Sequence, residues 1–220
     1  MTTPTASAPP VPASPVSAPS ASAPSASALP ASALSASAPS ALGRTARIGM
    51  FVDEVREAVG RGLAPDLTAQ LVAERLAPHL GAPDLLTAAQ RQGDAANYRQ
   101  HLLHAEPDGS FSVVALVWLP GQRTAIHDHV SWCVAGVHEG QERERRYDLL
   151  PDGTTSRLVA VAEVTNPLGS VAGFAPPGDI HRVWNAGAGM AISIHVYGAD
   201  VARLGSSVRR VYALPEGEDL

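Results

Sequence analysis

Many short apolar runs, separated by turns that contain Gly or Pro, constrain the fold of this sequence most. They begin after residue 98 and are rich in Val, Leu and Ile. Short runs that end at such turns are typical of β-strands. We expect strands at residues 112–119, 132–137, 143–150, 156–164, 169–174, 181–184 and 190–197. Many short strands without intervening helices favour a closed or double-sheet β fold over a parallel α/β sheet.

The residues before these runs have a helical period instead. Apolar side chains recur at helical spacing between residues 48 and 59 and between 67 and 76, and a third short run covers 85–90. We therefore expect one domain after an N-terminal tail. It spans residues 46–220, with a helical segment over 46–95 and a barrel over 98–213.

Residues 1–45 differ in composition from the rest. Up to about residue 42 they are almost only Ala, Ser, Pro and Thr, with no charged side chain. Such a stretch cannot bury enough apolar surface to offset its conformational entropy, so we expect a disordered tail. It lacks the early Lys or Arg of a secretory signal, and Pro interrupts each candidate apolar core.

Charge and cysteine content narrow the expected partners and location. The formal net charge is −5 and no basic run is present, so we expect no nucleic-acid partner. No stretch is long and apolar enough to predict a membrane span. Cys133 is the only cysteine, which excludes an intramolecular disulfide and fits the reducing cytoplasm, where we expect the protein.

Three histidines form the candidate metal site. His127 and His129 are two residues apart on an expected strand, so their side chains share a face and could bind one ion. Taken alone, the pair could equally be two ordinary strand histidines. His181 follows the turn Pro176-Pro177-Gly178 and supplies a third imidazole.

The segments around these histidines resemble the two motifs of the cupin superfamily. In the first, Gly121, His127, His129 and Gly140 keep the family spacing, and Cys133 replaces the usual Glu. The second motif comprises Pro176, Gly178, His181 and Asn185, with its upstream Gly one place off, at Gly169. The resemblance implies a mainly β cupin barrel (a double-stranded β-helix, or jelly roll) with a metal bound by the three histidines.

The replacement of the motif Glu affects the chemistry expected at the metal. Three neutral imidazoles leave the charge of the ion uncompensated, which favours anionic ligands such as a thiolate. Sites with two His and one carboxylate instead suit iron(II) oxygenases that use other co-substrates. Zinc held by three His could also activate a bound water, so the spacing alone leaves the metal open.

A second polar cluster is expected on the run 190–197. Ser193, His195 and Tyr197 share one face by strand alternation. Three polar side chains in a row on an inward face need mutual hydrogen bonds or a ligand. The alternative is that this face meets solvent.

With this face, the sequence from Tyr98 to Tyr197 resembles the cysteine dioxygenase family of thiol dioxygenases. The Trp118-x-x-Gly121 entry to the first motif and Trp132-Cys133 match as well. The resemblance implies Fe(II) as cofactor, a small thiol and O2 as substrates, and a sulfinate as product. It also implies that Tyr197 lies beside the iron and that Ser193 and His195 orient it through hydrogen bonds.

One departure from the family concerns the substrate carboxylate. Mammalian-type members bind it with an Arg two residues after the Tyr that matches Tyr98, and here that position is Gln100. Gln can donate a hydrogen bond but cannot form a charged fork. Bacterial members with this Gln resemble 3-mercaptopropionate dioxygenases, in which a later Arg assists; Arg209 or Arg210 could do so here. L-cysteine and 3-mercaptopropionate are both candidate substrates.

Cys133 is the second departure. With one residue removed between it and His129, it matches the cysteine that mammalian-type members bond to the Tyr of the polar cluster as a thioether, whereas many bacterial members have Gly there. We expect either a Cys133–Tyr197 crosslink or a small buried thiol. Asp128 is expected to point away from the metal, and the charge run 142–146 is expected to be solvated.

The sequence thus predicts an iron(II) thiol dioxygenase, with two alternatives. A cupin isomerase or hydrolase that uses zinc, nickel or manganese would not need the face of Ser193, His195 and Tyr197. A non-catalytic cupin that binds a small molecule would not need three convergent histidines.

Overall fold

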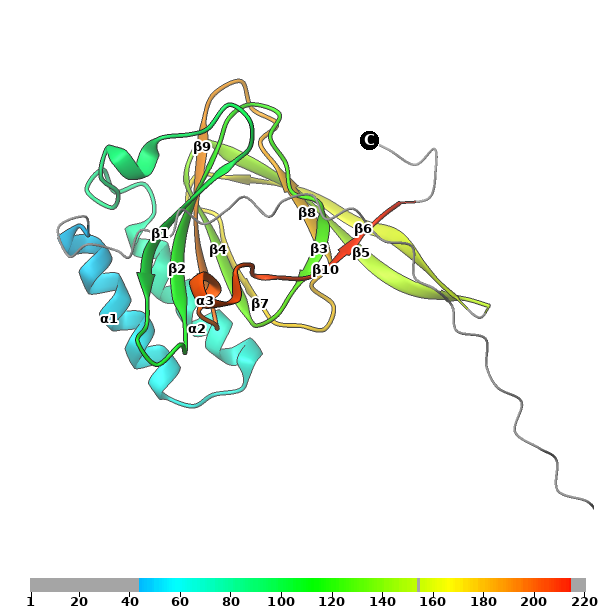
Figure 1. Ribbon diagram of the computed structural model, residues 1–220, viewed down its shortest axis with the longest axis horizontal. Coiled ribbons are helices and arrows are strands. Elements are labelled where there is room, and N and C mark those ends of the chain that lie inside the picture. The colour runs from blue at the N-terminus through cyan, green and yellow to red at the C-terminus, as the bar shows by residue number, and fades with distance from the viewer. Residues whose placement is uncertain (1–43, 154, 215–220) are drawn as a thin grey trace, which may run out of the picture.

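The computed structural model describes residues 44–153 and 155–214. The tail expected over residues 1–45 therefore lies almost wholly outside the described residues. Within them, the two long helices come first and the strands follow, with a short helix before the last strand (Figure 1).

Two antiparallel five-stranded sheets face each other and form a barrel (Figure 1). Sheet A has the order β1 (Arg99–Ala105), β2 (Ser112–Trp118), β9 (Ala191–Tyr197), β4 (Cys133–Glu139), β7 (Val171–Phe174). Sheet B has the order β10 (Val208–Tyr212), β3 (Ile126–His129), β8 (His181–Trp184), β5 (Gln141–Asp152), β6 (Thr155–Pro167). This is the mainly β cupin architecture that the sequence predicts, so the predicted fold class is confirmed.

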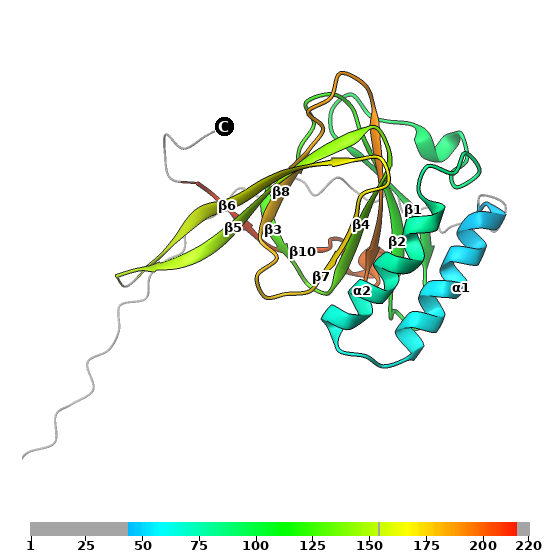
Figure 2. The same ribbon diagram turned by 180° about the vertical axis from the view of Figure 1, so that it is seen from behind.

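Helices α1 (Ala46–Gly60) and α2 (Pro65–Leu76) cover the outer face of sheet A (Figure 2). Apolar side chains of α1 such as Phe51 and Val55 are fully buried in one cluster with outward-facing residues of β2, β4 and β9. Burying a side chain of this size stabilises a fold by about 1.5–3 kcal/mol. At Gly173 on β7, an added Cβ would lie 2.4 Å from the carbonyl oxygen of Ala69, so α2 packs directly against the backbone of the sheet.

The inner faces of the two sheets enclose a second cluster, which surrounds the candidate site. It includes Val114, Leu116, Trp118, Cys133, Val183 and Tyr197, with Tyr98 and Phe174 packed against it. Alternate residues of β2 therefore face opposite ways: Val113, Ala115 and Val117 pack toward the helices. This alternation divides the inner, site-forming side chains from the outer core.

The turn between β4 and β5 explains the last Gly of the first motif. Gly140 has a φ of +70°, which L side chains rarely adopt. A Cβ there would also lie 2.7 Å from the carbonyl oxygen of Met190. After this turn, β5 and β6 form a long hairpin that projects beyond the barrel (Figure 1).

Two local expectations differ from the structure. The third helix expected over 85–90 is wrong, because this region holds only turns and the start of the short 3₁₀ helix η3 (Ala89–Arg91); another 3₁₀ helix, η2 (Ala77–His79), directly follows α2. Leu85 and Leu86 are both buried, and two adjacent buried side chains do not need a helical period. Strands β1 and β10 were not among the expected runs, because their polar residues dilute the apolar signal. A short helix, α3 (Val201–Leu204), precedes β10.

Candidate metal centre

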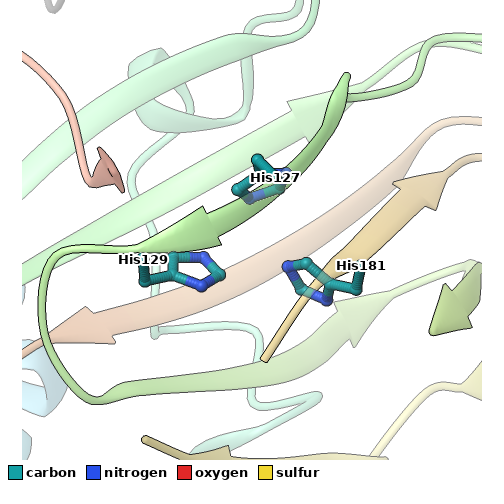
Figure 3. A group of neighbouring side chains, drawn as sticks. All are labelled: His127, His129 and His181. Atoms are coloured by element: carbon teal, nitrogen blue, oxygen red, sulfur yellow. The ribbon is translucent and has the colours of Figure 1, made fainter. Parts of the chain in front are cut away.

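Three buried histidines converge between the sheets (Figure 3). His127 and His129 lie on the same face of β3, and His181 begins β8, where it pairs in register with His127. The ring centroids are 4.8 Å apart for His127–His129 and His127–His181, and 5.1 Å apart for His129–His181. One nitrogen of each ring lies within 4.8 Å of the others. The structure thus brings together the three residues that the sequence predicts as ligands.

The second nitrogen of each ring contacts an acceptor. The Nδ1 atom of His127 donates to the carbonyl oxygen of Ala125 over 3.0 Å. Nδ1 of His129 donates to Asp179 over 3.1 Å, and Nδ1 of His181 donates to Glu144 over 2.9 Å. Because each Nδ1 then carries the proton, each Nε2 keeps its lone pair for a ligand bond.

Carboxylates beside two of these rings remain ionised despite burial. Burial raises the pKa of Glu144, but hydrogen bonds from His181 and Arg146 outweigh it and lower the pKa to about 2. Burial also raises the pKa of Asp179. The hydrogen bonds that Asp179 accepts from the side chain and the backbone N–H of His129 outweigh burial and lower this pKa below its usual value. The carboxylates that balance a bound cation therefore lie behind the imidazoles, although Cys133 occupies the motif position of Glu.

The imidazoles of His127 and His129 favour the neutral form that binds metals. Burial and the neighbouring His181 and His129 rings hold the pKa of His127 well below its usual value. Burial also lowers the pKa of His129, more than its contact with Asp179 raises it. Three imidazole nitrogens in a buried site fit a first-row transition metal such as iron or zinc.

Ser193, His195 and Tyr197 form a continuous hydrogen-bonded chain on β9. The Oγ atom of Ser193 lies 2.9 Å from Nε2 of His195, and the Tyr197 hydroxyl lies 3.3 Å from Nδ1 of the same ring. Nε1 of Trp118 donates to Ser193 over 3.1 Å. All three residues of the chain are buried, so this face does not meet solvent. The Tyr197 and His129 ring centroids are 6.1 Å apart, which brings the chain close to the three histidines.

Two residues predicted to contact substrate also lie together. Tyr98 stacks on Trp118 with ring centroids 4.5 Å apart. Burial raises the pKa of Tyr98, and a hydrogen bond with Gln100 offsets part of this rise. Tyr98 therefore adjoins the indole that contacts Ser193, and Gln100 contacts Tyr98.

The two arginines differ in their surroundings. Arg210 donates two hydrogen bonds to Asp128, at 2.9 Å from Nε and 2.5 Å from Nη2. Asp128 points to the opposite face of β3 from His127 and His129, as expected, and the structure does not bring Arg210 to the histidines. Arg209 is exposed at an irregularity in the pairing of β10 with β3.

Cys133 is fully buried and pairs in register with Tyr197 on the neighbouring strand. Burial raises the pKa of this thiol well above its usual value. It is therefore an uncharged group beside the polar chain.

Sequence reasoning missed three acidic residues near the histidines. Asp179 and Glu144 contact the ligand candidates as described, and Glu142 is only 3% exposed. The expectation that the run 142–146 is solvated is wrong for its two glutamates and holds for Arg146, which is exposed. Arg143 and Arg145 are half-buried and pair with Glu163 on the next strand. The signal was available: glutamates two residues apart on a strand share a face, here the inner one.

A small cavity adjoins the candidate centre. Its volume is about 50 Å³, and its lining includes Glu142, Glu144, His181, His195 and Phe174. A larger surface hollow of about 430 Å³ between Arg123, Arg143 and Trp184 has none of the three histidines in its lining. The inner cavity is the one connected with the site chemistry.

A family model supplies the comparison that identifies the chain. The model described as cysteine dioxygenase type I matches residues 88–204, more than half of the sequence. The chain belongs to the cysteine dioxygenase family. The matched range includes Tyr98, Gln100, the three histidines and the polar chain on β9, and ends before Arg209 and Arg210. The family resemblance predicted from the sequence is confirmed.

Solved cupin structures are also similar. They include an RmlC-like cupin protein from Desulfovibrio desulfuricans, with 19% identity, a TM-score of 0.36, and coverage of 49% of this chain and 88% of the other. A protein with a double-stranded β-helix domain from Klebsiella pneumoniae has 20% identity and a TM-score of 0.38, covering 52% and 87%. A cupin 2 conserved barrel domain protein from Salinispora arenicola has 21% identity and a TM-score of 0.34, covering 52% and 92%. Among the described residues, no helix is long and apolar enough to cross a membrane.

Proposed function

We propose that this protein is a non-haem iron(II) thiol dioxygenase that adds both atoms of O2 to the sulfur of L-cysteine, or of a related small thiol such as 3-mercaptopropionate, to give a sulfinate. The observation that carries the proposal is that one barrel interior contains both three convergent histidines and the chain Ser193–His195–Tyr197. Membership of the cysteine dioxygenase family supports it. Bound iron would supply the redox chemistry that combines O2 with the thiol sulfur.

The protein's contribution begins with a rigid set of ligands. Nε2 of His127, His129 and His181 would hold the ion, because each Nδ1 is occupied by an acceptor. Asp179 and Glu144 fix the planes of two of these rings and stabilise positive charge at the centre. Burial of all three rings excludes bulk water from the reacting sulfur.

Tyr197 is the proposed donor to the reacting groups. Burial raises the pKa of its hydroxyl well above the usual value, so the hydroxyl remains protonated at neutral pH. It can then donate a hydrogen bond to substrate or oxygen beside the histidines. His195 and Ser193 orient this hydroxyl, and Trp118 orients Ser193.

The substrate carboxylate is proposed to lie near Tyr98 and Gln100. Gln100 can donate one uncharged hydrogen bond to it, a weaker contact than an Arg fork. Arg210 is engaged by Asp128, so of the two arginines Arg209 is the better candidate for a supporting cation. The register of Cys133 opposite Tyr197 is compatible with a thioether between them, which stays part of the proposal together with a cytoplasmic location.

One experiment tests the function against its alternatives. The purified full chain is analysed for metal, then assayed for O2 uptake and sulfinate formation with a panel of small thiols. We expect bound iron and thiol-dependent O2 uptake that yields sulfinate. Zinc, nickel or manganese without O2 uptake would favour another cupin enzyme class, and no metal at all would favour a binding protein.

His181→Ala provides the matched test of the site. We expect it to lose both iron and O2 uptake, because two remaining imidazoles cannot complete the ligand set. His101→Ala is the control, since its ring bonds the carbonyl oxygen of Gln92 on the other face of β1 from Gln100. If His181→Ala kept iron and turnover, the proposal would be wrong.

A further inference from the structure

Glu142 is a buried carboxyl group without a role in the proposed mechanism. It follows the Gly140 turn on β5, and its Oε1 atom has no hydrogen-bond partner among the described residues. It lines the inner cavity together with His181 and His195. A buried carboxyl with an unsatisfied oxygen costs free energy, so its presence in the barrel interior calls for an explanation.

The polar neighbours of Glu142 belong to the chain on β9. The pKa of Glu142 is raised to about 7, mainly by burial and also by the nearby charge of Glu144. Hydrogen bonding with Ser193 and Trp118 lowers this pKa and offsets part of the rise. His181 on β8 and His195 on β9 are the other titratable groups of the cavity lining; β4 and β7 contribute apolar side chains such as Val137 and Phe174. Glu142 thus adjoins the Ser193 end of the series Tyr197–His195–Ser193.

The chain can be oriented in two ways because His195 is neutral. Burial lowers the pKa of His195 to about 3, so at neutral pH only one of its nitrogens carries a proton. Both nitrogens are in contact, Nε2 with Ser193 and Nδ1 with Tyr197. The tautomer of His195 therefore decides whether Tyr197 donates to the ring or accepts from it.

The charge of Glu142 selects between these tautomers. When Glu142 is ionised, Ser193 donates to the carboxylate and accepts from Nε2–H of His195. Nδ1 then accepts the Tyr197 proton, which is turned away from the histidines. When Glu142 is protonated, it donates to Ser193, Ser193 donates to Nε2, and Nδ1–H donates to the Tyr197 oxygen, so the Tyr197 proton is free to face the pocket. Trp118 donates to Ser193 in both arrangements.

We propose that Glu142 is a positioning residue whose protonation sets the direction of the Ser193–His195–Tyr197 hydrogen bonds, and so decides whether Tyr197 presents its proton to the substrate pocket. The proposal rests on the proposed function only in assigning Tyr197 to the substrate. The effect of Glu142 on the direction of these hydrogen bonds does not depend on which substrate the protein oxidises.

The test compares the wild type with Glu142→Gln, whose amide is uncharged at every pH and can donate to Ser193 as the neutral acid does. Glu163→Gln is the control, because Glu163 pairs with Arg143 and Arg145 on the outside of the hairpin. The first readout is nitrogen NMR of labelled histidine in the full chain loaded with diamagnetic Zn²⁺, which reports the His195 tautomer. The second is the pH profile of kcat for thiol oxidation in the iron-loaded protein.

In the wild type and in Glu163→Gln we expect His195 to change from Nδ1–H to Nε2–H as the pH rises through neutrality. In Glu142→Gln it should stay Nδ1–H. The wild-type kcat should fall about tenfold between about pH 6 and about pH 8, whereas that of Glu142→Gln should not. A tautomer that is independent of pH in the wild type, or that still changes in Glu142→Gln, would overturn the proposal. A tautomer change without any thiol oxidation would refute the proposed function and leave the role of Glu142 in place.

Discussion

At the scale of single residues, the acceptors behind the three imidazoles determine what the site can bind. A carbonyl oxygen and two carboxylates occupy the Nδ1 atoms, so the three Nε2 atoms have no choice of tautomer. Two of these acceptors are carboxylates. Their negative charge lies close to the metal centre and replaces the charge that a Glu at the position of Cys133 would provide. A site with three histidines can therefore be less positive than its ligand list suggests.

Gln100 gives a prediction about substrate preference. Because Gln100 offers no charge to a carboxylate, we expect 3-mercaptopropionate to be oxidised at least as efficiently as L-cysteine. Gln100→Arg should shift the balance toward L-cysteine, by restoring a charged fork where the carboxylate of cysteine would lie. The ratio of kcat/KM for the two thiols measures this directly.

Gln70→Arg is the control for that comparison, since Gln70 is exposed on α2. It adds the same charge without reaching the barrel interior. A clear preference for L-cysteine in the wild type, unchanged by Gln100→Arg, would mean that another cation binds the carboxylate.

At the scale of elements, His138 connects the barrel to the helical layer. This residue of β4 is 2% exposed, and its Nδ1 accepts the backbone N–H of Gly81 over 3.1 Å. Burial, with the nearby charge of Arg91, lowers the pKa of His138 to about 4. A lowered pKa means that the unfolded chain takes up the proton first. The stabilisation is therefore complete above about pH 6.5 and is lost as the pH falls toward about 4.

We expect His138→Gln, whose side-chain oxygen can still accept from Gly81, to weaken this pH dependence. The free energy of unfolding in urea should fall less steeply between pH 6.5 and 4 than in the wild type, by at most about 1.4 kcal/mol per pH unit, the value for one proton. His101→Gln should keep the wild-type slope. Equal slopes for His138→Gln and the wild type would show that the pKa of His138 does not differ between the folded and unfolded chains, which would contradict this prediction.

The elements also explain which predictions from the sequence succeed. The strands around His127, His181 and Ser193 were predictable because turn residues and cupin motifs mark their ends. β1 was not, because His101 and His104 interrupt its apolar pattern. Glu142 and Glu144 were misread as surface residues, because a charge run usually lies in solvent. Their spacing puts both on one face of β5, but only the pairing of β5 with β8 in sheet B shows that this face lines the barrel interior.

At the scale of the whole molecule, the helical layer and the barrel share one core, whereas the N-terminal residues lie outside the described part. Residues 1–43 contain no charged or aromatic side chain that could anchor them to this core. We expect deletion of residues 1–43 to leave the thermal unfolding midpoint and kcat nearly unchanged. Calorimetry and O2 uptake of the full and shortened chains test this. A marked loss of stability would contradict the composition argument.

The short pairing between β3 and β8 has a consequence for the life of the protein in a cell. Within these two strands the in-register pair is His127 with His181, whereas the backbone hydrogen bonds that continue the pairing, such as those of Thr124 and Asn185, lie on the Gly121 side of the histidines. An ion bound by histidines of both strands would link β3 to β8 and add stability that grows with the free metal concentration. A chain made during metal shortage should open there first and be degraded sooner. Metal supply would then govern how much of the protein accumulates, as well as how active each copy is.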